Sequence, residues 1–400
     1  MSIERTAGAL SRRALLRSAA GLAAAGAAQA FQSTPQFAYV GTYTSRGRGI
    51  HLYQVDANGG LRQLAAFRDV DNPSALAFDP TRRFLYAANE IGNYRGGTTG
   101  AVSAYAVNRS NGNLTFINAA SSGGGGPAHV SVDPSGKYVL PANYGGGNVA
   151  LLPVQPDGGV DEPTDVQALT GPLGPMRAVY GWPGSFAISG HDRPHAHMFE
   201  TDPAGKYAFA ADLATDRIFI FRLDAANGKL IPNENQPYLQ ALGGAGPRHF
   251  VFHPNSRWFY HVNEEDSTVT FSLYDASNGT LRSQQTLAAL PDKFAGTAFA
   301  SEIGLSPDQR YLYSLNRLYD SVAIFEVNQT TGELTKVGDE WTRGDYPRHF
   351  AIDPTGRFMY VLNQRSDHIT TFRIEDGGRR LAFTGNFTPV GMPSMMVFLT

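Results

Sequence analysis

Residues 346–363 read YPRHFAIDPTGRFMYVLN, and this stretch decides the fold because it is one full copy of a unit that recurs along the chain. A first apolar run ends at Asp353-Pro354-Thr355-Gly356, where proline fixes φ and glycine tolerates a positive φ, as a tight turn requires. A second run, rich in aromatic and β-branched residues, follows the turn. The stretch therefore predicts a strand, a turn and a second strand.

Earlier copies of the unit keep the same register. The turn proline always precedes an Asn or Asp by nine residues, in the pairs Pro80/Asn89, Pro134/Asn143, Pro203/Asp212, Pro254/Asn263, Pro307/Asn316 and Pro354/Asn363. Successive prolines are 54, 69, 51, 53 and 47 residues apart, a period typical of propeller blades and related β repeats. We expect the recurring Asn side chains to serve turn chemistry by bonding to the backbone that follows them.

A second series of turns interleaves with the first. Each of its dipeptides follows one short alternating strand and precedes another, so each repeat supplies four strands. These hairpin dipeptides are Asn58-Gly59, Asn111-Gly112, Asp157-Gly158, Asn227-Gly228, Asn278-Gly279, Thr331-Gly332 and Asp376-Gly377.

The two ends of the chain supply the missing parts of a last repeat. Residues 37–42 resemble a second strand without a first, and residues 391–399 resemble a first strand without a second. If the two halves pair, the circle closes and leaves no open sheet edge. The sequence therefore predicts an all-β, seven-bladed propeller with four antiparallel strands per blade, closed by pairing of the C-terminal strand with the N-terminal hairpins. This domain is expected to span residues 31–400.

Composition excludes several classes of protein. The 400 residues are 42% hydrophobic and 17% charged, which suits a large core, and the formal charge of −2 argues against a nucleic-acid partner. The chain has no cysteine, so thiolate nucleophiles and cysteine-ligated metals are excluded.

Residues 1–30 are expected to be an export signal rather than part of the fold. Ser11-Arg12-Arg13 precedes a run of Ala, Gly and Leu that ends at Ala28-Gln29-Ala30, an order that resembles a twin-arginine signal. The run is too short for a stable membrane span, so we expect none in the mature chain. The twin-arginine translocation machinery would then be a partner, and the mature protein would be periplasmic or extracellular. The alternative is a disordered basic tail followed by a short helix.

Propeller topology predicts where a site would lie. The start of each first strand and the residue after each strand-ending Asn meet at one end of the central channel. The first set is Ser74, Ala128, His197, Arg248, Ser301, Arg348 and Ser394, and the second is Thr42, Glu90, Tyr144, Leu213, Glu264, Arg317 and Gln364.

Charge is concentrated in three successive repeats, which contribute His197, Arg248, Glu264 and Arg317. Such a group can hold an anion or polarise a carbonyl while a base acts nearby. These four are the catalytic candidates. The alternatives are a structural Arg248–Glu264 ion pair, a hydrogen-bonded core histidine at 197 and a solvated Arg317 at the rim.

One position further along the first strands lies a second set: His129, His249, Glu302 and His349. Because alternate residues of a strand face opposite ways, we expect this set to support the site or bind substrate rather than react, and we place His195 and Arg348 with it. His195 and His197 diverge at i, i+2, and no third ligand follows by spacing, so zinc is not predicted. The leading interpretation has no metal, and the alternative is calcium held across the channel by oxygens of Glu90, Asn143 and Asn263. No motif calls for an organic cofactor.

Several motifs together resemble the lactonase family of seven-bladed propellers, which includes a bacterial 6-phosphogluconolactonase and the fungal carboxy-cis,cis-muconate lactonizing enzyme. They are Tyr39-Val40-Gly41-Thr42-Tyr43-Thr44, Gly246-Pro247-Arg248-His249-Phe250, Val262-Asn263-Glu264, Ser301-Glu302-Ile303, Leu315-Asn316-Arg317 and Met392-Pro393-Ser394. The resemblance covers residues 36–399. It implies opening or closing of a lactone ring without a cofactor, and it matches His197, Arg248 and Glu264 to the proposed site of the muconate enzyme. Arg317 is matched by its Asn-Arg motif alone, because its spacing from the other site residues differs from that in the muconate enzyme.

Our leading hypothesis is hydrolysis of a sugar-derived lactone. Arg248 and Arg317 would hold the developing negative charge, and Glu264 or His197 would activate water. Export favours unphosphorylated aldonolactones over a phosphorylated gluconolactone. The alternatives are a muconate-type lactonizing cycloisomerase and a noncatalytic propeller that binds a glycan or a protein.

Overall fold

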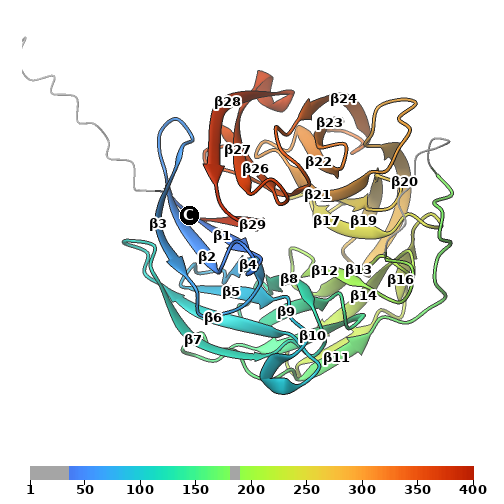
Figure 1. The fold of residues 1–400 in the computed structure, drawn as a ribbon. Coiled ribbons are helices and arrows are strands. Elements are labelled where there is room, and N and C mark those ends of the chain that lie inside the picture. Colours follow the sequence, from blue (N-terminus) through green and yellow to red (C-terminus); the bar gives the residue numbers. More distant parts are fainter. Residues whose placement is uncertain (1–35, 181–189) are drawn as a thin grey trace, which may run out of the picture. The chain divides into compact units, whose positions relative to one another are not determined.

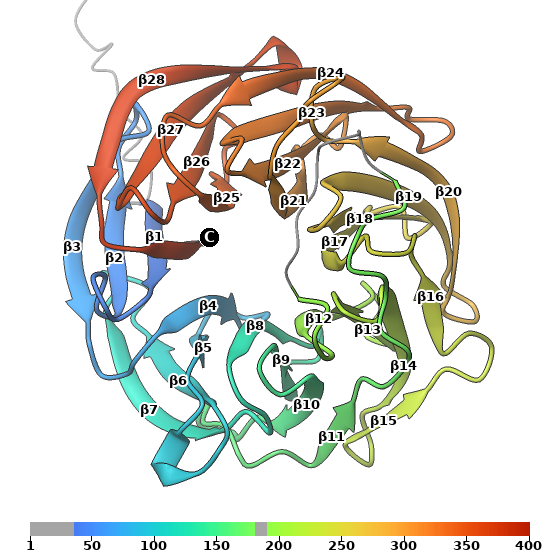
Figure 2. The same ribbon diagram turned by 45° about the vertical axis from the view of Figure 1, so that its right-hand side comes forward.

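The computed structural model describes residues 36–180 and 190–400, and within them the strands form seven antiparallel blades of four strands each, one with an additional short strand. The innermost strand of each blade lies nearest the axis of the ring, which we call the central channel, and the later strands of the blade lie progressively further out (Figure 2). The predicted export signal lies outside the described residues. Within the described ranges, no helix is long and apolar enough to cross a bilayer.

The strands repeat in the same order from the channel outward. The innermost strands are β4 (Pro73–Phe78), β8 (Pro127–Val132), β12 (Ala196–Thr201), β17 (Pro247–Phe252), β21 (Phe299–Leu305), β25 (Pro347–Ile352) and β29 (Pro393–Leu399). The second strands are β5 (Phe84–Asn89), β9 (Tyr138–Asn143), β13 (Tyr207–Asp212), β18 (Trp258–Asn263), β22 (Tyr311–Arg317), β26 (Phe358–Asn363) and β1 (Gln36–Thr42).

The outer half of each blade is a hairpin. The third strands are β6 (Ala101–Val107), β10 (Asn148–Pro153), β14 (Arg217–Asp224), β19 (Thr268–Asp275), β23 (Ser321–Val327), β27 (His368–Glu375) and β2 (Ile50–Val55). The fourth are β7 (Leu114–Ser121), β11 (Asp165–Ala168), β15 (Lys229–Pro232), β20 (Thr280–Ala288), β24 (Leu334–Trp341), β28 (Arg380–Pro389) and β3 (Leu61–Phe67). The additional strand β16 (Tyr238–Gln240) pairs with β14, and short 3₁₀ helices occupy Tyr94–Gly96 and Asp376–Gly378.

The two ends of the described chain close the ring, as the sequence predicts. β29 pairs antiparallel with β1, from Phe37 opposite Leu399 to Thr42 opposite Pro393. Figure 1 shows β29 and the C-terminal end beside β1. β29 also contacts the innermost strands of the two adjacent blades, β25 and β4. The C-terminal strand is therefore the innermost strand of the blade that β1 to β3 begin, and the circle has no open edge.

The aspartate of each Asp-Pro turn organises the turn that sequence analysis identified. Asp353 Oδ1 accepts hydrogen bonds from the backbone N–H groups of Arg357 and Phe358, at 2.8 and 2.7 Å. Gly356 adopts a φ of 71°, which the turn requires. The same contact joins Asp133 to the Tyr138 N–H at 2.7 Å, so the turn chemistry repeats with the sequence.

Tyrosines of the second strands fasten neighbouring blades together, a feature that the sequence pattern did not reveal. Four of them reach the hairpin turn of the next blade, and each donates its hydroxyl to a glycine carbonyl there. The contacts are Tyr39 to Gly112 (2.6 Å), Tyr86 to Gly158 (3.1 Å), Tyr260 to Gly332 (2.8 Å) and Tyr313 to Gly378 (2.7 Å). Because a buried hydroxyl is stabilised by such a partner, these four contacts help to hold neighbouring blades in register.

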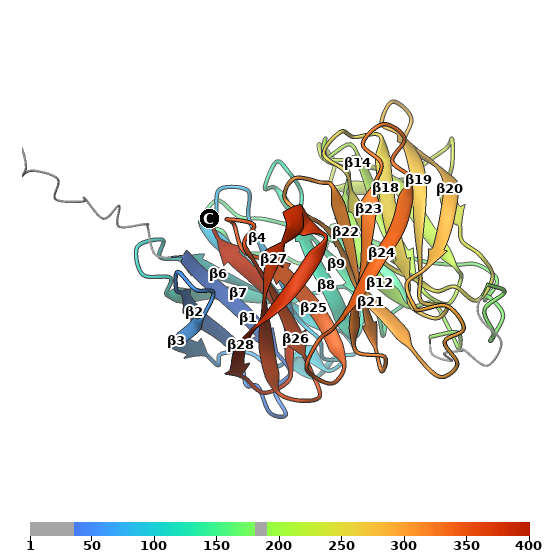
Figure 3. The same cartoon turned by 90° about the horizontal axis from the view of Figure 1, so that it is seen from above.

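The hydrophobic core lies between the faces of adjacent blades. One cluster packs Tyr260 and Val262 of β18 against Leu312 of β22 and Phe325 of β23. Outer strands of neighbouring blades also touch, as β24 and β28 do (Figure 2). Figure 3 shows β18, β19 and β20 of one blade lying side by side. Because both faces of the inner strands are covered, these strands read as nearly continuous apolar runs.

Candidate active site

A cavity of about 250 Å³ lies at one end of the central channel, and we call it the axial cavity. It is lined by residues of successive blades: Glu90, Ala128, Tyr144, His197, Glu264, Phe299, Arg317, Tyr346 and Arg348. Most of them occupy the two positions that topology singled out, the start of an innermost strand or the residue after a strand-ending Asn. His197, Glu264 and Arg317 therefore open onto the same end of the channel.

Two lining aromatic residues, Phe299 and Tyr346, were missed by sequence reasoning. The Arg317 guanidinium lies over both rings, 5.6 Å from the centroid of Phe299 and 5.0 Å from that of Tyr346. The Tyr346 hydroxyl also accepts a hydrogen bond from Arg317 Nη1 at 3.2 Å. Tyr346 directly precedes Pro347, so in sequence it looks like an ordinary turn residue.

Glu264 joins two buried arginines. Its Oε2 lies 2.8 Å from Arg248 Nε and 2.7 Å from Arg317 Nη2. The Arg248 contact lacks the alignment of a hydrogen bond and is an ion pair, while Arg248 Nη1 donates to the Ser301 carbonyl. Burial alone would raise the pKa of Glu264, but Arg317 and Arg248 outweigh it and lower that pKa. Burial, and then Arg317, lowers the pKa of Arg248 to about 9.

Arg348 is held differently from the other two arginines. Its closest carboxylate contact is Glu90 Oε2, 3.8 Å from Nη2, and its guanidinium lies 5.4 Å from the centre of the Tyr43 ring. Tyr43 in turn donates to the same Glu90 oxygen at 2.7 Å. Burial would lower the pKa of Arg348, but Tyr43 and Glu90 raise it. Within the described part of the chain no hydrogen bond uses its donors, so this cation can serve a bound ligand.

A β-bulge at the start of the innermost strands corrects the expectation that alternate residues face opposite ways. In β17, Pro247 pairs with Asn263 and His249 pairs with Val262, so Arg248 is an extra residue without a partner. The same shift occurs around His197 in β12 and around Arg348 in β25. Because a bulge re-aims side chains, Arg248 and His249 both line the channel.

The second set of residues lies directly beneath the axial cavity. His129, His249, Glu302 and His349 surround a space of about 10 Å³ together with His197, Arg248 and Arg348. His197 Nδ1 lies 3.1 Å from His249 Nε2, and His249 Nδ1 lies 3.0 Å from Glu302 Oε1. His349 Nε2 is 3.5 Å from Glu302 Oε2. The catalytic candidates and this set therefore form one continuous polar column.

Burial keeps the histidines of this column neutral. It is the main cause that lowers the pKa of His197 and of His249 well below the ordinary value, and the Arg248 charge adds to it. Burial likewise lowers the pKa of His129 to about 3 and that of His349 to about 4.

His195 lines neither space. Its ring stacks on Tyr144 with centroids 4.2 Å apart, and it bonds to the Asp192 carboxylate at 2.7 Å and to the Tyr144 carbonyl at 2.9 Å. It therefore touches the axial cavity only through Tyr144.

The recurring Asn side chains do not bond as expected. Asn89, Asn143 and Asn316 donate Nδ2 to the carbonyls of Asp71, Ser122 and Ala289, which precede the Asn in sequence. Only the Asp212 member of the described set follows the expected pattern, because its Oδ1 accepts from the Thr215 N–H at 2.9 Å. Each of these three Asn side chains therefore ties its strand to the connection that enters its own blade.

Comparisons with known proteins place the chain in a family. Residues 37–398 match the model of the family described as "Lactonase, 7-bladed beta-propeller". The chain belongs to this lactonase family. It is 33% identical to a 6-phosphogluconolactonase of Bacillus subtilis over 80% of this chain and 85% of the relative, and 33% identical to a 6-phosphogluconolactonase of Pectobacterium carotovorum over 76% and 81%. The solved structure of a periplasmic gluconolactonase from Pseudomonas aeruginosa has a TM-score of 0.81 and 30% identity, covering 92% of this chain and 99% of that one.

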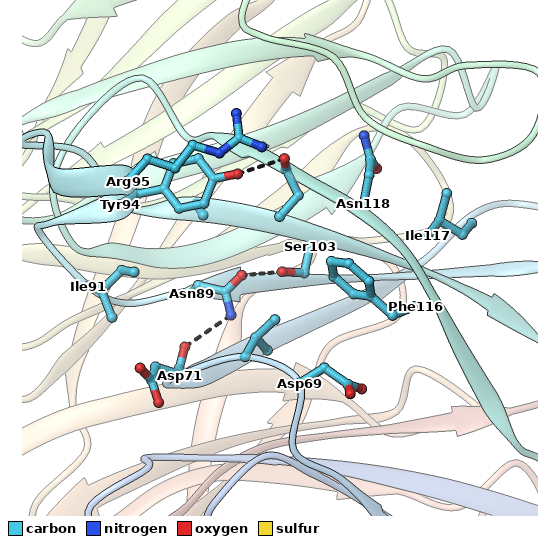
Figure 4. A pocket seen from close by; sticks show the side chains of 13 residues that line it. Asp69, Asp71, Asn89, Ile91, Tyr94, Arg95, Ser103, Phe116, Ile117 and Asn118 are labelled. Carbon is cyan, nitrogen blue, oxygen red and sulfur yellow. Dashed lines mark hydrogen bonds between the residues drawn. The ribbon is translucent and has the colours of Figure 1, made fainter.

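This lactonase-family chain also has a larger cavity, of about 470 Å³, outside the channel (Figure 4). Its walls come from β5, β6, β7 and the segment that leads into their blade. Its polar groups serve the fold: Asn89 donates to the Asp71 carbonyl, Ser103 donates to Asn89 Oδ1, and Tyr94 donates to the Ala119 carbonyl. The catalytic candidates of the lactonase-family chain lie elsewhere, so size alone does not mark the site.

The buried histidines make the stability of this lactonase-family protein sensitive to acid. The pKa of His129 and that of His261 each fall to about 3 through burial, whereas an unfolded histidine titrates near 6.5. Below that value the unfolded chain binds protons that the native state does not, so stability is lost as pH falls, by about 1.4 kcal/mol per unit for each group. Glu200 acts in the opposite sense, because burial raises its pKa to about 7.

We therefore expect the free energy of unfolding to drop by at least about 2 kcal/mol between pH 6.5 and pH 5, as measured by urea denaturation at each pH. His261 is 1% exposed, and its two ring nitrogens have no hydrogen-bond partner among the described residues. His261→Phe should therefore flatten the slope. A wild-type stability that stays level over this range would contradict the assignment of neutral buried histidines.

Proposed function

We propose that the protein hydrolyses a sugar-derived lactone of the aldonolactone class in the axial cavity, by metal-free acid–base catalysis with arginine charge stabilisation. The observation that carries the proposal is the meeting of His197, Glu264, Arg317 and Arg348 around one cavity of about 250 Å³. An imidazole, a carboxylate and several guanidiniums can together supply the proton transfer and the oxyanion stabilisation that catalyse acyl transfer to water. Membership of the lactonase family supports the same reaction class.

Of the two candidate bases, the geometry favours His197. Glu264 Oε2 already lies within 2.8 Å of two guanidinium nitrogens, so the oxygen that would accept a proton is already engaged by two cations. His197 is neutral, and within the described residues its Nε2 has no hydrogen-bond partner. His197 Nε2 would take a proton from water, whose oxygen attacks the lactone carbonyl carbon.

The arginines would stabilise the oxyanion that forms on the carbonyl oxygen. Arg248 and Arg317 supply positive potential, but their contacts to Glu264 and to backbone carbonyls use several of their donors. Arg348 has donors to spare and is the group we assign to the carbonyl oxygen or a neighbouring hydroxyl. The His197 imidazolium would then return its proton to the ring oxygen as the C–O bond breaks, which yields the hydroxy acid.

Relatives point to two versions of the substrate. The Bacillus subtilis relative is a 6-phosphogluconolactonase, and the Pseudomonas aeruginosa structure is a periplasmic gluconolactonase. The predicted export signal favours the unphosphorylated lactone for this chain. A pH-stat assay of the chain beginning at residue 31 tests this directly, with gluconolactone, its 6-phosphate and a carboxymuconate as substrates. Turnover of the carboxymuconate without net acid release would favour the cycloisomerase, and saturable binding without turnover of any lactone would favour a noncatalytic role.

Export is the second part of the proposal. We infer that residues 1–30 are removed and that residues 31–400 fold as the propeller domain before twin-arginine export to the periplasm or beyond. Replacing Arg12 and Arg13 by lysines should retain the protein in the cytoplasm in a fractionation experiment. Unchanged export of that variant would contradict the assignment.

Arg348→Met is expected to lower kcat/KM for the lactone by about 10- to 100-fold, because one charge-assisted hydrogen bond contributes roughly 1.5–3 kcal/mol. Initial rates over a range of lactone concentrations measure the loss. Arg348→Lys keeps the charge but loses the planar fork, so it should recover only part of the activity. If Arg348→Met hydrolyses the lactone at the wild-type rate, Arg348 does not bind substrate.

A further inference from the structure

We propose that Glu302, acting through His249, is a positioning residue that sets the tautomer of His197 and directs its Nε2 lone pair to the axial cavity. The inference rests on the proposed function, in which His197 is the base. It adds a chain of three side chains, Glu302–His249–His197, in which only the last member touches substrate.

The three residues come from three neighbouring innermost strands: Glu302 from β21, His249 from β17 and His197 from β12. Glu302 Oε1 is fixed by two contacts, 3.0 Å to the backbone N–H of Ile303 and 3.0 Å to His249 Nδ1. His249 Nε2 is 3.1 Å from His197 Nδ1. All three side chains are buried, so the chain of contacts is shielded from solvent.

The tautomers follow from counting donors and acceptors. Ionised Glu302 can only accept, so His249 Nδ1 carries the hydrogen that lies between them. A neutral His249 then has a lone pair on Nε2, which obliges His197 Nδ1 to donate. His197 is left with an unprotonated Nε2, the atom that a general base needs.

The groups around His197 favour the neutral ring. Glu302, acting through His249 on the side away from the axial cavity, stabilises the protonated ring when it forms. The His197 ring is approached by Tyr144 and His249, by the cations Arg248, Arg317 and Arg348, and through His249 by the Glu302 carboxylate. The cations lower the pKa of His197, as burial does, and so keep the base free. When water transfers a proton to Nε2, the imidazolium charge is offset by Glu302 through the polarised His249.

The proposed reaction is complete without any proton transfer to Glu302. The water O–H bond breaks, its hydrogen goes to His197 Nε2, and the water oxygen bonds to the carbonyl carbon. When the tetrahedral species collapses, the same hydrogen goes to the departing ring oxygen, and His197 is neutral again. Glu302 stays ionised and His249 keeps its Nδ1 hydrogen throughout, just as the orienting carboxylate of a Ser-His-Asp triad is never protonated.

The tautomer can be observed without any substrate. In ¹⁵N-histidine-labelled protein, long-range ¹H–¹⁵N spectra near pH 7 should show His197 and His249 both protonated at Nδ1 and unprotonated at Nε2. His197→Gln and His249→Gln would assign the signals. A His197 that carries its proton on Nε2 overturns the inference, even if the protein proves to be an active lactonase. The predicted pattern in a protein without lactonase activity would instead overturn only the proposed function.

Kinetics of two variants test whether the chain acts as a unit. Glu302→Leu and His249→Phe should each lower kcat at least about tenfold, with KM within about threefold of wild type. The kcat of the double variant should be no lower than that of the worse single variant, because either change alone already interrupts the Glu302–His249–His197 contacts. The acid limb of the kcat profile should also move to lower pH in both single variants, since the Glu302 charge no longer supports the imidazolium.

The control is His253→Asn, because His253 lies in the same blade and is as buried as His249 but faces the turn at the other end. It should keep wild-type kcat and pH profile. Two results would refute the role of Glu302 and His249 as a positioning pair and show that they merely fill space. One is a loss of kcat in the double variant that equals the product of the two single losses, and the other is a pH profile that does not move.

Discussion

Glu264→Gln is expected to lower the free energy of unfolding by about 3–5 kcal/mol, because it leaves two buried guanidiniums without the carboxylate between them. Arg248 and Arg317 are 1% and 3% exposed, and each lies within 2.8 Å of the same Glu264 oxygen. Without that negative charge, their mutual repulsion in a buried environment is uncompensated. Lactone hydrolysis should fall at least about tenfold as well, since the arginines that shape the cavity wall would move apart.

Urea denaturation of the purified variant measures the stability loss, and a pH-stat assay below its unfolding transition measures the activity. Glu340→Gln is the matched control, because Glu340 contacts Arg343 at 2.7 Å on the surface. A surface pair contributes only about 0–1 kcal/mol, so this variant should remain close to wild type. If Glu264→Gln were as stable and as active as Glu340→Gln, the buried cluster would have no role in either folding or catalysis.

The fold could be predicted because its determinants are local and repeated. Asp353-Pro354 and the equivalent turns, the hairpin glycines and the alternation of the strands each lie within a short stretch, and their period implies a ring. Closure followed from the two incomplete ends, which pair as β29 with β1. The Tyr260 hydroxyl contact to Gly332 spans two blades, and no local pattern in the sequence indicates it.

The candidate site was predictable in position but not in its contacts. Topology placed His197, Glu264 and Arg317 at one end of the channel, because the strand ends of every blade meet there. Strict alternation would turn His249 away from the channel, but a bulge of one residue turns both Arg248 and His249 towards it, and His249 lies in the layer beneath the axial cavity. Whether Glu264 would serve as a base or as a counter-ion depended on distances across three blades, and these require coordinates.

His197→Gln is expected to lower kcat about 10²- to 10⁴-fold, the usual contribution of a positioned acid–base group. The amide of glutamine keeps much of the volume and polarity of the ring but cannot accept a proton from water. Because burial and Arg248 lower the pKa of His197 well below 6.5, the wild-type enzyme should keep its full kcat/KM as pH falls through 6.5 and lose it only at more acidic pH. Rates measured from pH 7.5 downward, after subtraction of spontaneous lactone opening, give both results.

The control for His197→Gln is His261→Gln, which replaces another buried histidine, on the second strand β18 of a neighbouring blade, that lines neither space of the channel. Its kcat should equal that of wild type at temperatures where it is folded. If the wild-type kcat/KM already falls at or above pH 6.5, the general base is an ordinary, solvated histidine. If His197→Gln and His261→Gln hydrolyse the lactone at equal rates, His197 is not the general base. The remaining carboxylate at the cavity, Glu90, is engaged by Tyr43 at 2.7 Å but is not clamped between two arginines, and it would then be the group to replace next.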